Sequence, residues 1–161
     1  MHVVTLRILS SALFALVMTL AQPSAAQSRR GDCNLTVSDM AFGQYDVFEA
    51  GPTETVTRIL VDCGRTASRI RPTVELSAGS SQSFARRTQR SGSHVLTYNI
   101  YADRSLTRIV GDGSSGTTVL HLEPFGEGLR TKKVDLYGAV DPRQFVPPGS
   151  YFDTVYVTLI F

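Results

Sequence analysis

The chain ends in the stretch GSYFDTVYVTLIF, residues 149–161. One parity of this stretch carries only large apolar side chains near its end: Val155, Val157, Leu159 and Phe161. Since alternate side chains of a β-strand point to opposite faces of a sheet, the stretch predicts a strand with one buried face. A strand at a chain terminus has an open edge unless another strand pairs with it. It is therefore either the last strand of a complete sandwich or an edge that needs a partner.

Six further β-rich runs precede this strand, at residues 33–37, 53–63, 73–76, 94–101, 118–122 and 134–140. Gly-, Ser- and Pro-rich turn segments separate them, and we find no long run with helical periodicity after residue 26. About seven short strands at this spacing predict an all-β sandwich or barrel in a single domain.

The composition is that of one ordinary globular domain. The chain has 161 residues, of which 42% are hydrophobic and 19% charged, and its formal net charge is +2. This apolar content argues against disorder, and the small net charge gives no electrostatic reason to expect nucleic-acid binding.

The first 26 residues have the organisation of a secretory signal peptide. Arg7 precedes an apolar run at residues 8–20, and Ser24-Ala25-Ala26 has the small residues of a cleavage site. The alternative is a membrane anchor, but the 13 residues of the run are short for a membrane span. We therefore expect a signal peptide at 1–26, a mature domain at 27–161, and no membrane span after cleavage.

Export also bears on the cysteines, because Cys33 and Cys63 both lie in the mature part. An isolated pair in an oxidising compartment is expected to form a disulfide, the alternative being two free thiols. The bond would close a loop of 31 residues, worth about 3–4 kcal/mol in the chain-entropy model. Neither His94 nor His121 has metal-ligand spacing to a cysteine, so we expect no metal site.

A search for catalytic chemistry gives only weak candidates. We find no nucleophile motif or phosphate-binding loop, and we expect neither enzyme activity nor a cofactor. The carboxylates of Asp103, Asp112 and Asp153 are the weak acid–base candidates. Asp103 and Asp112 are instead expected to cap turns, and Asp153 to fix the start of the last strand. Arg86, Arg87 and Arg90 are interpreted as a solvated basic cluster.

Several segments, taken together, resemble the spore coat protein U domain family. They are Cys33 with Phe42-Gly43-Gln44-Tyr45, then Cys63; residues 96–103; the turn Gly111-Asp112-Gly113; residues 134–138 with Gln144; and the terminal pattern Gly149-x-Tyr151-x-Asp153-x-Val155. The family often has Trp before Gly-Asp-Gly, whereas this chain has Val110. Gly111, Asp112, Gly113, Gly149, Tyr151 and Asp153 are accordingly predicted to be structural turn residues.

The resemblance implies an incomplete, pilin-type immunoglobulin-like sandwich, exported through the periplasm to the cell surface as part of a pilus or coat. A periplasmic chaperone would donate a strand beside residues 151–161, and an outer-membrane usher would exchange it for the N-terminal segment of another subunit. The groove residues would be Val155, Val157, Leu159 and Phe161.

The mature N-terminus departs from what a donating subunit needs. Residues 27–32, QSRRGD, contain no apolar side chain, and Arg29 and Arg30 would be costly to bury unpaired. We expect a subunit that accepts a strand but donates poorly, at the tip of a fibre or as an accessory.

Two other functions were weighed. A secreted binding module for glycans or surfaces would need an exposed apolar patch, which Phe42, Tyr45 and Phe48, or residues 145–148, could supply, although we expect these residues to pack in the core and turns. A periplasmic hydrolase is disfavoured because we find no nucleophile–base pair.

Overall fold

The computed structural model describes residues 2–10, 33–64, 71–126 and 129–161, and nearly all of its regular structure is β. Besides a short 3-10 helix at Gly79–Ser81, it has ten strands: β1 (His2–Ser10), β2 (Asn34–Val37), β3 (Met40–Ala41), β4 (Thr53–Asp62), β5 (Thr73–Leu76), β6 (Arg87–Ser91), β7 (His94–Tyr101), β8 (Leu120–His121), β9 (Thr131–Val140) and β10 (Tyr151–Ile160). Within these residues, no helix is long and apolar enough to cross a membrane.

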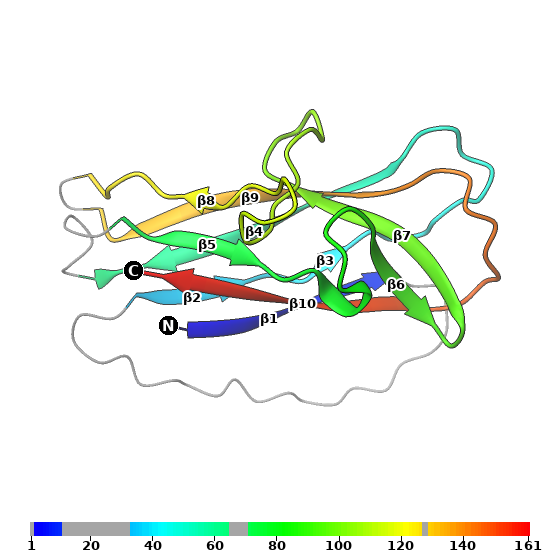
Figure 1. Cartoon of the computed structure of the whole chain (residues 1–161), viewed down its shortest axis with the longest axis horizontal. Helices are drawn as coiled ribbons and strands as arrows, with labels where there is room; N and C mark the ends of the chain where they lie inside the picture. Colours follow the sequence, from blue (N-terminus) through cyan, green and yellow to red (C-terminus); the bar gives the residue numbers. More distant parts are fainter. Residues whose placement is uncertain (1, 11–32, 65–70, 127–128) are drawn as a thin grey trace.

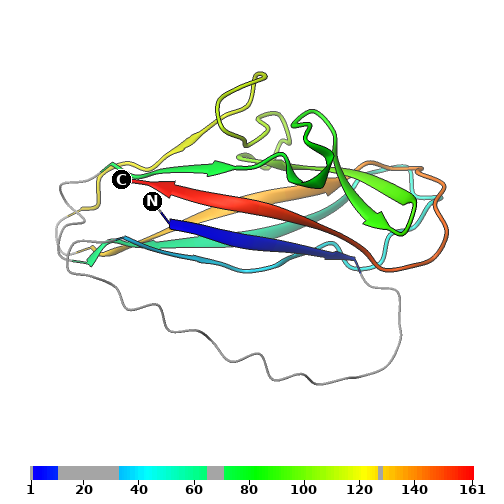
Figure 2. The same cartoon turned by 60° about the horizontal axis from the view of Figure 1, so that its bottom comes forward.

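The strands wrap around a single core. Hydrogen bonds connect them in the order β2-β4-β9-β7-β6-β10-β1-β3, and β5 pairs with both β10 and β8. The result is an elongated sandwich in which β4 and β9 lie in one layer and β10 with β1 in the other (Figures 1 and 2). Apart from the β1–β3 pair, all strand pairs of this path are antiparallel. The predicted all-β sandwich is confirmed.

The terminal strand has the alternation that its sequence predicts. Val155, Val157 and Leu159 are fully buried, while the residues between them are wholly or partly accessible. Phe161 departs from the prediction, because β10 ends at Ile160 and the Phe161 side chain is 42% exposed. In the pairing of β10 with β5, Ile160 lies opposite Thr73, and Phe161 follows the end of the strand.

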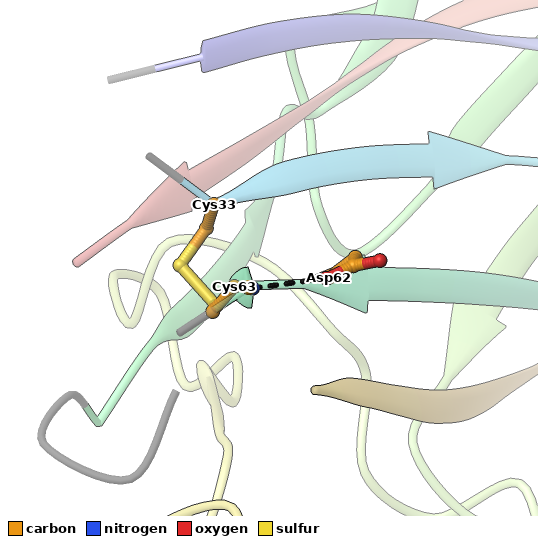
Figure 3. The surroundings of a disulfide bond; sticks show 4 residues. Cys33, Asp62 and Cys63 are labelled. Atoms are coloured by element: carbon orange, nitrogen blue, oxygen red, sulfur yellow. Dashed lines mark hydrogen bonds between the residues drawn. A yellow bond between two sulfur atoms is a disulfide. The ribbon is translucent and has the colours of Figure 1, made fainter. Parts of the chain in front are cut away.

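The disulfide prediction is confirmed by a bond between Cys33 and Cys63. This bond joins the residue before β2 to the residue after β4, as Figure 3 shows. Both cysteines are buried, and they extend the antiparallel pairing of Asn34 with Asp62. The bond therefore fixes β2, at one end of the hydrogen-bonded path, to its neighbour β4.

Strand β6 was missed because its inward side chains are polar. Arg87 and Gln89 are both fully buried, and Arg87 is not part of a solvated cluster as predicted. Its guanidinium donates to the carbonyl oxygens of Ser77 and Val110 and to Asn99 Oδ1, at 2.6–3.1 Å. Burial lowers the pKa of Arg87 from its ordinary value. These hydrogen bonds let a cation occupy a core position and fasten two loops to β7.

The predicted turn at Gly111–Gly113 lies between β7 and β8. Gly113 has φ +86°, in the left-handed region that favours glycine. Asp112 Oδ1 accepts the Ser114 N–H at 2.8 Å, and hydrogen bonding from the side chain and the backbone of Ser114 lowers the Asp112 pKa. Asp103 caps a neighbouring turn by accepting hydrogen bonds from Ser105, Thr107 and Arg108, and these hold its pKa well below the usual range.

A glycine in β9 permits close packing at the centre of the sandwich. An added Cβ at Gly138 would lie 2.5 Å from Met40 Sδ and 2.9 Å from ring atoms of Phe42. Both side chains are buried. Gly138 therefore lets the segment around β3 approach β9, and this places one wall of the groove described below.

Replacing Gly138 by alanine should destabilise the full chain by about 1–3 kcal/mol, because Met40 and Phe42 must both move. Chemical denaturation of the oxidised chain measures the effect. Gly51→Ala is the matched control, since nothing lies within 4 Å of its added Cβ. Equal effects of the two substitutions would contradict the packing role of Gly138.

Candidate strand-acceptor groove

The strand that completes the sandwich comes from the predicted signal peptide. β1 pairs antiparallel with β10 over its whole length, from His2 opposite Leu159 to Ser10 opposite Tyr151. Its other edge pairs in parallel with β3, where Ile8 lies opposite Met40 and Leu9 opposite Ala41. Figures 1 and 2 both show β1 beside β10, with its C-terminal end toward the loop that precedes β10.

The side chains of β1 alternate as those of an inserted strand must. Leu6 is fully buried, and Val4 is partly buried against the core. Val3, Thr5 and Arg7 point the other way and are exposed. Burying a Leu side chain is worth about 1.5–3 kcal/mol, so Leu6 is the main anchor among the side chains that the structure describes in β1.

In the full chain, residues 2–10 of the predicted signal peptide form β1. The reason is the alternation of Val4 and Leu6 with polar or exposed neighbours, which suits a strand as well as a leader. Cleavage after Ala26 stays a prediction. Residues 11–32, including that site and the QSRRGD segment, lie outside the described residues.

Removal of β1 would leave a groove between two unpaired edges. Among the described residues from 33 onward, no strand pairs with the edge of β10 that β1 covers, since β5 and β6 lie on its other side. β3 would lose its partner as well. The floor of this groove would include Val155, Val157 and Met40, all fully buried when β1 is present.

The groove residues predicted from sequence are thus only partly brought together. Val155, Val157 and Leu159 share the buried face of β10, and Phe161 lies beyond it. Leu6 and Met40 were missed. Met40 belongs to a strand of two residues, too short for a periodic pattern, and Leu6 belongs to a segment whose composition predicts export.

A buried polar cluster fixes the first residues of β10. Asp153 Oδ2 accepts the Tyr98 hydroxyl at 2.8 Å, and Asp153 Oδ1 accepts the N–H groups of Ser80 and Thr154. Burial, together with the adjacent carboxylate, raises the Tyr98 pKa above its ordinary value, so this hydroxyl stays a proton donor at neutral pH. Asp153 therefore ties β10 to β7 and to the 3-10 helix.

The loops at the Tyr151 end of the groove form a cleft of about 680 Å³. Its walls are residues 43–47 and 146–149, together with Leu96 and Tyr151. The Tyr45 hydroxyl donates to Asp141 O at 2.9 Å and accepts the Gln144 N–H at 2.8 Å. The Tyr151 hydroxyl donates to Pro147 O at 2.8 Å. These bonds hold the two walls in place.

Two exposed phenylalanines stand next to this cleft. Phe48 is 80% exposed and Phe145 is 77% exposed, and their rings meet edge to face with centroids 6.2 Å apart. Two of the other residues considered for an exposed patch have the packing role that we expected instead. Phe42 is buried in the core, where it packs edge to face on Tyr98, and Tyr45 is half-buried.

The described residues include all of the polar side chains considered as catalytic or metal-binding candidates. His94 and His121 are exposed on strands, and Asp103 and Asp112 cap turns. Within the same residues, no group of three or more His, Cys, Asp or Glu side chains could hold a metal ion.

Comparisons with known proteins agree with this fold. The family model described as Spore Coat Protein U domain matches residues 19–158 and confirms the resemblance found in the sequence. A chain of the CsuC–CsuE chaperone–tip adhesion subunit pre-assembly complex, from the archaic chaperone–usher Csu pili of Acinetobacter baumannii, has a similar fold, with a TM-score of 0.55 at 17% identity. The match covers 81% of this chain and 40% of that chain. A search of curated proteins gives no match.

Replacing Leu6 by alanine in the uncleaved chain should cost about 2–5 kcal/mol of unfolding free energy, because it leaves a cavity under β1. Denaturant unfolding of the refolded, oxidised chain provides the measurement. Thr5→Ala, on the exposed side of the same strand, should change stability by less than about 0.5 kcal/mol. If Leu6→Ala is as mild as Thr5→Ala, β1 does not occupy the groove in solution.

Proposed function

Since the chain belongs to the Spore Coat Protein U domain family, we propose that it is an exported structural subunit of a chaperone–usher pilus or surface coat, completed by a β-strand from another polypeptide. The observation that carries this proposal is the position of β1. The strand that fills the edge of β10 comes from the segment expected to be removed on export.

Export would therefore open the groove. Loss of residues 1–26 removes β1, including the Leu6 side chain that covers the groove, and leaves the edges of β10 and β3 unpaired. Strand addition from a partner would satisfy the same N–H and C=O groups and refill the same positions. About four or five inserted side chains would contribute on the order of 6–15 kcal/mol, which is comparable to the stability of a whole domain. The mature chain alone should accordingly be marginal and prone to aggregate.

The proposed partners follow from this need. A periplasmic chaperone would cover the groove first, and an outer-membrane usher would then exchange it for the strand of another subunit. The similar solved structure is described as a chaperone–tip adhesion subunit pre-assembly complex, which supports a chaperone as the first partner. The route places the protein in the periplasm and then at the cell surface. Its role would be structural, with no enzyme activity.

The donor function is proposed to be weak. Residues 27–32 offer two arginines and no apolar side chain to a neighbouring groove. A subunit that receives a strand but does not pass one on terminates a fibre, so we place it at the tip or as an accessory subunit.

A second candidate function is a secreted binding module for glycans or surfaces. The exposed Phe48–Phe145 pair favours it, because an apolar patch rimmed by polar loops is typical of a binding surface. This function would suit a lone secreted monomer, whose Phe48–Phe145 pair faces no partner subunit.

Co-expression of residues 27–161 with a periplasmic chaperone from the same genome should give a soluble 1:1 complex, since the chaperone strand replaces β1. Val157→Arg, on the buried face of β10, should abolish the complex. Tyr156→Arg, on the exposed face, is the matched control and should leave it intact. Pull-down and light scattering provide the readout. A lone mature monomer as stable as the uncleaved chain would overturn the proposal.

A further inference from the structure

The groove does not end where β1 ends, because the strands on both of its sides lead into the walls of the loop cleft. β1 finishes at Ser10, opposite Tyr151, and the Tyr151 side chain itself lines the cleft. Residues 146–149, directly before β10, form one wall. On the other side, β3 ends at Ala41 beside Leu9, and the opposite wall begins two residues later at Gly43.

A chain that continues from the β1 position therefore heads between the two walls. Beyond Ser10, an antiparallel partner of β10 meets the residues before Tyr151, and a parallel partner of β3 meets the residues after Ala41. These are the two segments that line the cleft. At about 3.3 Å per residue, three or four extended residues would cover about 10–13 Å of it.

The chemistry of the cleft suits an apolar peptide. Gln44 and Asp46 are polar members of its lining. Most of the other side chains are aromatic, aliphatic or prolyl: Tyr45, Val47, Leu96, Val146, Pro147, Pro148 and Tyr151. The exposed rings of Phe48 and Phe145 flank it, next to Val47 and Val146. The hydrogen bonds of Tyr45 and Tyr151 hold the walls in place, so little ordering is needed before a ligand binds.

We propose that this cleft is an extension of the strand-acceptor groove and binds the apolar residues that directly follow the incoming strand. The inference rests on the proposed function, since it assumes that a partner strand takes the place and direction of β1. It adds that the partner is recognised by the segment after its strand as well as by the strand itself. The occupant is thus an extended peptide with an apolar side chain within four residues of the strand end.

Three synthetic peptides test this. The first is HVVTLRILS, the sequence of β1. The second carries the extension Gly-Leu-Phe-Gly at its C-terminus, and the third carries Gly-Ser-Ser-Gly. Each peptide is labelled and refolded with oxidised residues 27–161, and its dissociation from the complex is followed by fluorescence anisotropy. The apolar extension should tighten binding about ten- to hundredfold over the first peptide, and the Gly-Ser-Ser-Gly extension should not.

The double variant Phe48→Ser, Phe145→Ser should reduce this gain to less than about threefold and leave the affinity of HVVTLRILS unchanged. Val56→Ser, an exposed apolar position on β4, is the control and should retain the full gain. A gain that survives the double variant, or no gain from the apolar extension, would overturn the cleft assignment alone. Failure of HVVTLRILS to bind would overturn the proposed function as well. An oligosaccharide that binds the same complexes and competes with the extension would assign the cleft to a glycan instead and overturn the inference.

Discussion

The pairing of β10 on both edges is the constraint on which the rest of the structure depends. β10 carries the buried face Val155, Val157 and Leu159 through the middle of one layer, and β5 and β6 cover only one of its edges. The other edge needs a strand, because unpaired backbone groups beside a buried apolar floor are costly. In the full chain β1 meets that need, and in doing so it also supports β3 and the packing of Met40.

The sequence predicts those parts of the fold in which one face is apolar. The β-rich run at residues 53–63 predicted β4, the alternation in residues 151–161 predicted the buried face of β10 as far as Leu159, and export predicted the disulfide. β6 escaped prediction because its inward residues are Arg87 and Gln89, and only tertiary hydrogen bonds make a guanidinium tolerable there. The groups that bind the Arg87 guanidinium come from distant segments, so no local pattern in β6 predicts them.

The candidate site was predictable on one side only. The terminal strand predicted an open edge. The strand that pairs with it, β1, lies in a segment whose basic and apolar composition is already explained by an export signal. A signal peptide and a donor strand need overlapping properties, namely apolar side chains without helix-breaking residues or buried charge. Composition therefore does not tell one from the other. The loops around Tyr45 and Gln144 could not be predicted for a different reason, because the hydrogen bonds of the Tyr45 hydroxyl join residues almost one hundred positions apart.

Two N-terminal segments, β1 and residues 27–32, differ in how well they suit an apolar groove. Leu6 and Val4 enter the core at alternate positions, while Arg7 stays on the exposed side and keeps its charge in water. In QSRRGD, adjacent arginines at 29 and 30 place one cation on each face of any strand, so one of them would face the floor of a neighbour's groove in every register. Arg87 is tolerated in the core because three polar groups surround its guanidinium, whereas the described groove floor of Val155, Val157 and Met40 is apolar. The same physics favours filling this groove and disfavours donating to another, which supports the proposal of an acceptor at the end of an assembly.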